Sequence, residues 1–175
     1  KRRIDCANEL VKLIPKEVKT KELLTIHKPI SRQLILTAQA MQGSESLVKR
    51  CHENNIPMAL VTSSSSESFQ IKTAPHQWMN LFSVMVLGDD KLLAKGKPAP
   101  DPYLLAAEKL NIAAQECWAV EDSISGVSSA LEAGCSVFFL KEKNDELTKR
   151  EVFDQNINLK QITYLKEIEQ LLNEY

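Results

Sequence analysis

The 175-residue sequence lacks an excess of charge of either sign. It has 22 basic and 23 acidic residues, which gives a formal net charge of −1, and the two kinds are mixed along the chain. A nucleic-acid-binding domain needs a basic face, and an acidic tail needs a run of like charges. The sequence has neither feature, so it predicts a small-molecule partner and no nucleic acid.

Long apolar runs are also missing. No stretch approaches the roughly 20 apolar residues of a membrane span, and residues 1–3 do not lead into a signal-peptide core. The four cysteines, which form no Cys-x-x-Cys pair, are Cys6, Cys51, Cys117 and Cys135. Widely spaced thiols in or beside apolar segments are typical of a reducing compartment. We therefore expect a cytoplasmic protein with no disulfide bonds and no membrane partner.

What the sequence does have is the apolar content of a folded domain and two kinds of pattern. Hydrophobic residues make up 43% of the chain, enough to bury a sizeable core. Residues 6–40 carry apolar side chains at three-to-four spacing, interrupted by Pro15, which predicts helices without strands.

From residue 44 onward, short apolar runs alternate with helical patterns of about ten residues. The expected strands lie within 56–62, 82–90, 117–122 and 135–140, and the expected helices within 44–54, 67–72, 102–110, 123–133 and 164–172. We expect Gly134 to end the helix at 123–133. This alternation predicts an α/β fold with a parallel sheet and right-handed crossovers.

Polar residues gather where these strands end. Thr62 ends the first strand, and the adjacent Glu121 and Asp122 end the third. Ligands of open parallel sheets bind beyond the carboxyl ends of the strands. Adjacent carboxylates there can bind Mg²⁺, which keeps several waters and binds substrate phosphate as well. The alternative is an ordinary helix start, with Asp122 or Ser123 as the capping residue.

Two further features suit a phosphate. Thr62, Ser63 and Ser64 combine hydroxyls with a turn into a helix whose first amides can point at an anion. Lys97, in a loop constrained by Pro98, can place an ammonium group against phosphate oxygens. Each feature has a structural alternative, which is a helix-capping run for the hydroxyls and a solvated turn for the lysine.

Taken together, three segments resemble the last three signature motifs of the haloacid-dehalogenase-like hydrolases. They are VTSS at 61–64, KGKPAPDPYLLAA at 95–107 and VEDSISGVSSALEAG at 120–134. The resemblance is to the branch that includes beta-phosphoglucomutase and pseudouridine-5'-phosphatase, and the stretch 62–90 is similar to the latter. It implies a three-layer, Rossmann-like core over residues 42–175 and a helical cap, of which residues 1–41 form a part.

The resemblance also implies an activity and a set of site residues. It implies a Mg²⁺-dependent phosphatase of a small phosphorylated metabolite that works through a phospho-aspartyl intermediate. By position, Thr62 and Ser63 would bind the phosphoryl oxygens, and Lys97 would offset the charge shared by nucleophile and phosphate. Glu121 and Asp122 would hold Mg²⁺, with Glu121 as a direct or an outer ligand.

Substrate contact from the cap would fall to Arg3, whose guanidinium could grip a phosphate or a hydroxylated ring. The alternative for Arg3 is an exposed basic residue without a role in binding.

One signature of the family is absent. Its first motif, D-x-D-x-[TV], supplies the nucleophile and a proton donor, and no D-x-D occurs in this sequence. In the family the first strand lies between the strand ending at Thr62 and the strand ending at Asp122. We therefore expect a segment upstream of Lys1 to complete sheet and site, and the 175 residues alone to be inactive. Without it, we expect the two facing edges to pair by exchange or collapse, or a strand to be displaced.

Two other functions stay open at this point. A phosphomutase would use the same residues but return the phosphoryl group to the substrate. A catalytically inactive fragment or binding module would explain the absent nucleophile.

Overall fold

The structure is a computed structural model that describes residues 3–14, 18–141 and 156–172. The strands are β1 (Ala59–Val61), β2 (Val84–Val86), β3 (Trp118–Glu121), β4 (Ser136–Leu140) and β5 (Leu159–Ile162). The α-helices are α1 (Arg3–Leu10), α2 (Thr20–Leu36), α3 (Ser44–Glu53), α4 (Ser66–Thr73), α5 (Asp101–Leu110), α6 (Ile124–Ala133) and α7 (Lys166–Leu171). Short 3₁₀ turns are η1 (Val11–Leu13), η2 (Gln77–Leu81) and η3 (Ala114–Glu116).

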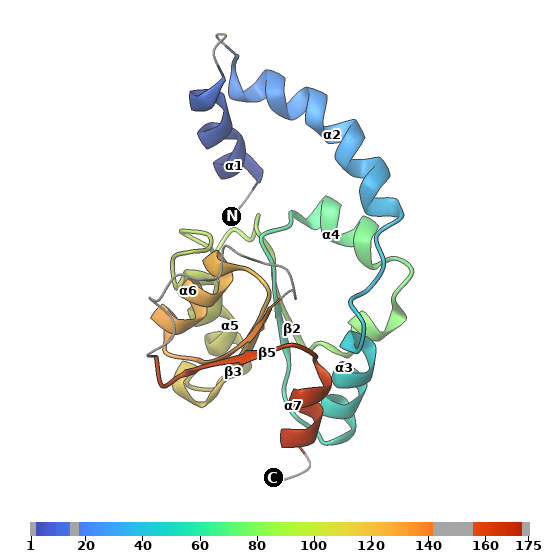
Figure 1. Cartoon of the computed structure of the whole chain (residues 1–175), viewed down its shortest axis with the longest axis vertical. Coiled ribbons are helices and arrows are strands. Elements are labelled where there is room, and N and C mark those ends of the chain that lie inside the picture. Colours follow the sequence, from blue (N-terminus) through green and yellow to red (C-terminus); the bar gives the residue numbers. More distant parts are fainter. Residues whose placement is uncertain (1–2, 15–17, 142–155, 173–175) are drawn as a thin grey trace.

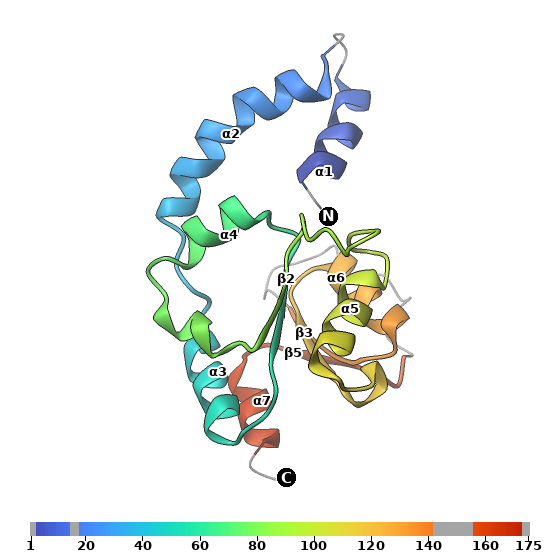
Figure 2. The same cartoon turned by 180° about the vertical axis from the view of Figure 1, so that it is seen from behind.

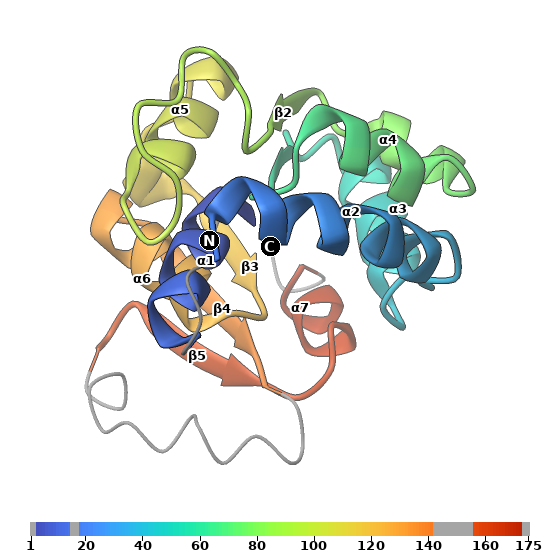
Figure 3. The ribbon, with the colours of Figure 1, turned by 90° about the horizontal axis from the view of Figure 1, so that it is seen from above.

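All strand pairs in the described residues are parallel, which confirms the predicted α/β fold. The strands form two separate sheets, β1–β2 and β3–β4–β5, and β1 does not pair with β3. Seen from above, β2 stands apart from β3, β4 and β5 (Figure 3), although β2, β3 and β5 adjoin in the view of Figure 2. The gap between the sheets falls where the family's first strand is expected. The prediction that the two facing edges would pair through collapse is wrong for the described strands, because β1 and β3 stay unpaired with each other.

Helices cover both faces of the larger sheet. On one face, α5 and α6 pack against β3 and β4 around a core that includes Val127 and Val137. On the other face, α3 and α7 pack against β4 and β5 around Leu47, Phe138 and Ile168. This gives the three layers that the resemblance implies, with helices on each side of a parallel sheet.

The helix ends follow from local chemistry. Ser123 precedes α6, and its hydroxyl oxygen accepts a hydrogen bond from the Gly126 amide at 3.1 Å, which satisfies one of the unpaired amides of the first turn. Gly134 ends the same helix with φ +95°, a left-handed conformation that glycine adopts without steric cost. The prediction that Gly134 ends this helix is confirmed.

The helices α1 and α2 stand beyond the edge of the sheets where α4 and α6 begin (Figures 1 and 3). Ion pairs from Lys28 (3.1 Å) and Arg32 (4.0 Å) to Glu67 connect α2 with α4. The predicted boundary between residues 41 and 42 falls in the segment that joins α2 to α3. No helix in the described ranges has the length and apolar composition of a membrane span.

Candidate active site

A buried lysine lies at the centre of the candidate site. The loop between β2 and α5 carries Lys97 to the space between the ends of β1 and β3, where its side chain is only 8% exposed. Its ammonium group donates to the Val61 carbonyl oxygen at 3.1 Å, contacts the Tyr103 hydroxyl at 3.5 Å, and forms an ion pair with Glu121. A buried ammonium needs such partners, because burial without them would disfavour its charge.

Glu121 connects the side chains of this group. Its Oε1 accepts hydrogen bonds from Lys97 and from the Tyr103 hydroxyl, and its Oε2 accepts from the Ser123 hydroxyl at 3.3 Å. Gly126 leaves room for the carboxylate, because a Cβ there would lie 1.9 Å from Oε2. Both carboxylate oxygens therefore have partners within the protein.

Burial raises the pKa of Tyr103, and the neighbouring Glu121 carboxylate raises it further. The phenol therefore stays protonated and keeps donating to Glu121. The sequence patterns did not identify Tyr103 as a site residue.

Asp122 differs from Glu121 in its surroundings. It is exposed, and it lines a cavity of about 950 Å³ together with residues such as Gly43 and Lys166. Its negative charge still reaches Tyr103, whose pKa it helps to raise, so it lies near the buried group. In the described residues, no hydrogen bond joins Asp122 or Thr62 to Lys97.

The donor chemistry fits Mg²⁺ if this chain supplies one direct carboxylate. No group of three or more acidic, histidine or cysteine side chains in the described part of the chain could hold a metal ion. Mg²⁺ is commonly bound through one or two carboxylates, with waters and phosphate oxygens completing its shell. Asp122 is placed for that role, whereas Glu121 already accepts hydrogen bonds from Lys97, Tyr103 and Ser123.

Thr62 and Ser63 lie at the end of β1, as predicted. The Thr62 amide pairs with the Val86 carbonyl oxygen at 2.9 Å, and its Oγ1 accepts from the Ser64 amide at 3.1 Å, which leaves the hydroxyl proton to be donated. Gly88 permits a close approach of this loop to the end of β2, because a Cβ at Gly88 would lie 2.3 Å from the Ser63 carbonyl oxygen. The two loops at this edge are thereby held together.

At α4, two of the first helix amides already have partners within the protein. The Ser66 amide donates to both Asp89 oxygens at 2.9 and 3.0 Å, and the Ser66 hydroxyl donates to Asp89 as well. The Ser68 amide donates to the capping Ser65 hydroxyl oxygen at 3.5 Å. The start of α4 therefore uses Ser65 and Asp89 as partners of its amides, whereas phosphate binding by Thr62 and Ser63 stays a prediction.

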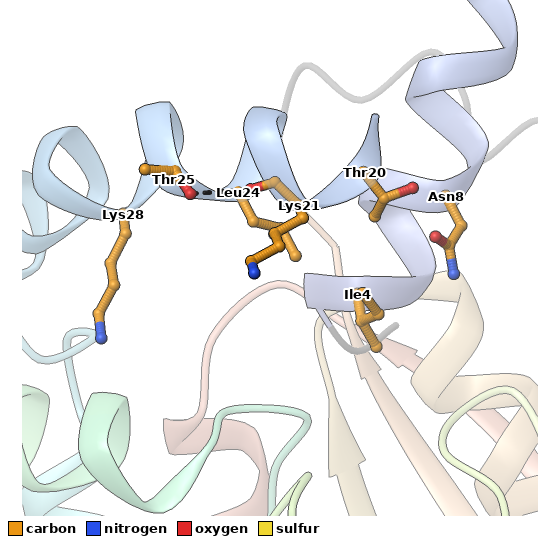
Figure 4. Close-up of a pocket in the computed structure, with 7 residues that line it drawn as sticks. All are labelled: Ile4, Asn8, Thr20, Lys21, Leu24, Thr25 and Lys28. Carbon is orange, nitrogen blue, oxygen red and sulfur yellow. Dashed lines mark hydrogen bonds between the residues drawn. The ribbon is translucent and has the colours of Figure 1, made fainter. Parts of the chain in front are cut away.

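A second cavity, of about 460 Å³, lies between α1 and α2 (Figure 4). It is lined by Ile4, Asn8, Thr20, Lys21, Leu24, Thr25 and Lys28. Its lining mixes apolar side chains with hydroxyl, amide and ammonium groups. Arg3, predicted to face the substrate, is the first residue of α1, and its side chain lies outside the described part of the structure.

The fold and the strand-end residues agree with comparisons to known proteins. The family model for the haloacid dehalogenase-like hydrolases matches residues 4–140. The chain therefore belongs to the haloacid dehalogenase-like hydrolase family.

Two curated relatives are named phosphatases. The chain is 31% identical over 150 residues to "(DL)-glycerol-3-phosphatase 2" of Arabidopsis thaliana, which covers 82% of this chain and 62% of the relative. It is 38% identical over 113 residues to the "Probable pseudouridine-5'-phosphatase" of Drosophila melanogaster, covering 62% of this chain and 49% of the relative. The chain thus matches about half to three fifths of these relatives.

A solved structure of beta-phosphoglucomutase from Clostridium difficile has the same fold. It superposes with a TM-score of 0.73 over 99% of this chain and 78% of the other, at 20% sequence identity. At that identity the likeness supports the fold and not the reaction.

Proposed function

We propose that this chain carries most of the active site of a Mg²⁺-dependent phosphatase that hydrolyses phosphate monoesters of small metabolites. The observation that carries the proposal is the buried Lys97 ammonium, fixed by Glu121 and the Val61 carbonyl between two strand ends. The transferred phosphoryl group carries negative charge, and a fixed cation in a site with little water stabilises that charge strongly.

The neighbouring residues have distinct tasks in this proposal. Thr62 donates its free hydroxyl proton to a phosphoryl oxygen, and Ser63 offers a second hydroxyl. Glu121 holds Lys97 in place, with Tyr103 fixing the carboxylate from the other side. Asp122 binds the Mg²⁺ ion, which neutralises part of the phosphate charge when bound.

We further propose that a segment outside these 175 residues supplies the attacking carboxylate. One of its oxygens forms a bond to phosphorus while the ester P–O bond breaks, and the leaving oxygen takes a proton. Water then cleaves the acyl phosphate, which releases inorganic phosphate and restores the carboxylate. The 175 residues alone therefore bind phosphate without turning a substrate over.

The substrate class follows from the cap cavity and from the relatives. The cavity between α1 and α2 offers hydroxyl, amide and apolar contacts, which suit the polyol or nucleoside part of a phosphate ester. Relatives named for glycerol 3-phosphate and pseudouridine 5'-phosphate support substrates of this size.

The first experiment measures binding of inorganic phosphate to the 175-residue chain by isothermal titration calorimetry, with and without Mg²⁺. We expect Mg²⁺ to strengthen phosphate binding, and Asp122→Asn to remove that effect. Thr62→Val should weaken phosphate binding by roughly tenfold, the cost of one hydrogen bond. Glu132→Gln, an exposed change on α6, serves as the control. An unchanged Mg²⁺ effect in Asp122→Asn would refute the metal assignment.

The second experiment measures turnover in a polypeptide that joins these residues to a carboxylate-bearing first strand. Phosphate release from glycerol 3-phosphate or pseudouridine 5'-phosphate would support the phosphatase. Interconversion of sugar-phosphate isomers without net phosphate release would favour the phosphomutase instead.

A further inference from the structure

The loop at 62–65, which joins β1 to α4, is held by three hydrogen bonds at Ser64. The Ser64 amide donates to Thr62 Oγ1 at 3.1 Å, and the Ser64 carbonyl oxygen accepts from the Gly88 amide at 2.8 Å. The third hydrogen bond comes from Lys72, whose ammonium group donates to the Ser64 hydroxyl oxygen at 3.0 Å. The side chain and both backbone groups of Ser64 therefore have partners.

Lys72 lies in the last turn of α4, and its side chain returns toward the start of that helix. Helical side chains tilt toward the helix N-terminus, which directs the long lysine stem back to the loop. Lys72 is exposed, and among the described residues no carboxylate forms an ion pair with it. Glu67, in the first turn of the same helix, pairs with Lys28 and Arg32 of α2 instead. The ammonium group is therefore directed at the loop and not at an acid in the described part of the chain.

The direction of these hydrogen bonds decides what Thr62 can do. An ammonium group only donates, so the Ser64 hydroxyl oxygen is the acceptor from Lys72. The Ser64 amide also only donates, so Thr62 Oγ1 accepts, and the proton of the Thr62 hydroxyl has to point elsewhere. A side-chain oxygen that accepts from the amide two residues later is held in one rotamer. The loop therefore presents the Thr62 hydroxyl as a donor in a fixed direction.

We propose that Lys72 is a positioning residue of the phosphate site. Its ammonium group holds the Ser64 side chain and thereby keeps the Ser64 amide on Thr62 Oγ1, so that Thr62 donates its hydroxyl proton to a phosphate oxygen. Lys72 itself does not touch the phosphate. Charge-assisted hydrogen bonds are stronger than neutral ones, which allows an exposed lysine to order the loop despite the side-chain entropy that it loses.

This inference rests on the proposed function, because it assigns the Thr62 hydroxyl to phosphate. The alternative role for Lys72 is structural, since a cation in the last turn of a helix also stabilises the helix through its dipole. That role predicts a loss of stability and no separate effect on phosphate binding. Binding and stability therefore have to be measured on the same variants.

The main experiment measures binding of inorganic phosphate to the 175-residue chain by isothermal titration calorimetry in the presence of Mg²⁺. Lys72→Met should weaken binding roughly fivefold, because an unrestrained Thr62 hydroxyl loses much of one hydrogen bond to phosphate. Lys72→Arg keeps a cationic donor and should bind within about twofold of the parent chain. Lys160→Met removes an exposed lysine from β5 and serves as the control. The urea midpoint of each variant should stay at that of the parent chain, because each change is at the surface.

A double-variant cycle tests whether Lys72 acts through Ser64. Ser64→Ala removes the hydroxyl that Lys72 holds, so adding Lys72→Met to Ser64→Ala should change phosphate binding by less than about twofold. The ratio of the dissociation constants of Lys72→Met and the parent chain should also be the same at low and at high salt, because salt screens only a direct effect of charge. A full additional loss in the Ser64→Ala chain, or a ratio that falls with salt, would mean that Lys72 acts as a charge near the phosphate and would overturn the positioning role.

Amide hydrogen exchange, followed by NMR, gives a readout that needs no phosphate. The Ser64 amide, which donates to Thr62 Oγ1, should exchange roughly threefold faster or more in Lys72→Met than in the parent chain. The Thr62 amide, which donates to the Val86 carbonyl oxygen in the strand ladder, should exchange at the parent rate in both chains. An unchanged Ser64 amide would show that Lys72 does not order the loop.

The remaining outcomes separate this inference from the proposed function. Phosphate binding by Lys72→Met as tight as by the parent chain would refute the role of Lys72 and leave the proposed function standing. Weaker binding that Lys72→Arg does not restore, or that comes with a matching loss of stability, would also count against the positioning role. No phosphate binding by the parent chain would refute the proposed function, and the role of Lys72 in phosphate binding with it.

Discussion

The two sides of β3 differ in how completely they are packed. Toward β4, the strand is hydrogen-bonded along its length, and the core beside it includes Val127, Cys135 and Val137, each no more than 2% exposed. Toward β1, the same strand borders an apolar slot of about 630 Å³ between β1 and β3 and leaves Val120 41% exposed. The side chains of an apolar strand are therefore buried only where neighbouring elements cover them. The incompletely covered side of β3 is the side on which Lys97 lies.

The largest expected effect comes from breaking the ion pair that bridges the two sides. Lys97→Met leaves the Glu121 carboxylate buried without its cation, so we expect a loss of about 3–5 kcal/mol in the free energy of unfolding. Urea denaturation measures this loss. The double variant Lys97→Met with Glu121→Gln should recover most of it, because no uncompensated charge is then buried. A double variant as unstable as the single one would show that the ion pair is not the cause.

A matched pair of valine substitutions compares the packed side with the open side. Val127→Ala removes two methyl groups from a site that is 0% exposed and should cost about 2 kcal/mol. Val120→Ala removes the same groups from the slot and should cost less than about 1 kcal/mol, because solvent already reaches them. Chemical denaturation of both variants under one set of conditions provides the measurement. Equal costs would mean that the slot is packed as tightly as the core.

The free energy of unfolding should also fall at alkaline pH, because of a thiol on the packed side. Burial, with a smaller contribution from Cys117, raises the pKa of Cys135 from 9.0 to about 11. Below pH 9 the thiol is neutral in both states. As the pH rises from about 9 to 11, only the unfolded chain ionises, so stability falls by about 2 kcal/mol.

Unfolding curves at several pH values, compared with Cys135→Ala, isolate this contribution. We expect a shallower pH dependence in Cys135→Ala, whereas Cys6→Ala, at an exposed position, should keep the dependence of the parent chain. The same dependence in Cys135→Ala as in the parent would locate the titrating group elsewhere.

Much of the fold could be predicted because strands and helices alternate with clear apolar periods. The sequence did not predict β5, a short strand in which Lys160 and Gln161 are both exposed, so its two-residue alternation is interrupted. It did predict the two facing edges beside the site, but not that they would stay apart.

The site could be predicted in part, because strand-end polar residues are visible in the sequence. The contacts of Tyr103 and Asp89 were not, because each depends on a distant segment. Tyr103 reaches Glu121, 18 residues away, and Asp89 binds Ser66, 23 residues away. The packing of α5 on the sheet brings Tyr103 to Glu121, and the close approach of two loops brings Asp89 to Ser66. Local sequence patterns do not contain this information.

The comparison between the two sides of β3 is tested most directly by residue-resolved amide hydrogen exchange, measured by NMR on the 175-residue chain. The account predicts alternation within single strands: the amides of Ala119 and Leu60, which face β4 and β2, exchange slowly, whereas those of Val120 and Val61, which face the slot, exchange fast. Equal, strong protection of Val120 and Ala119 would show that the edge is already paired and would contradict the open slot.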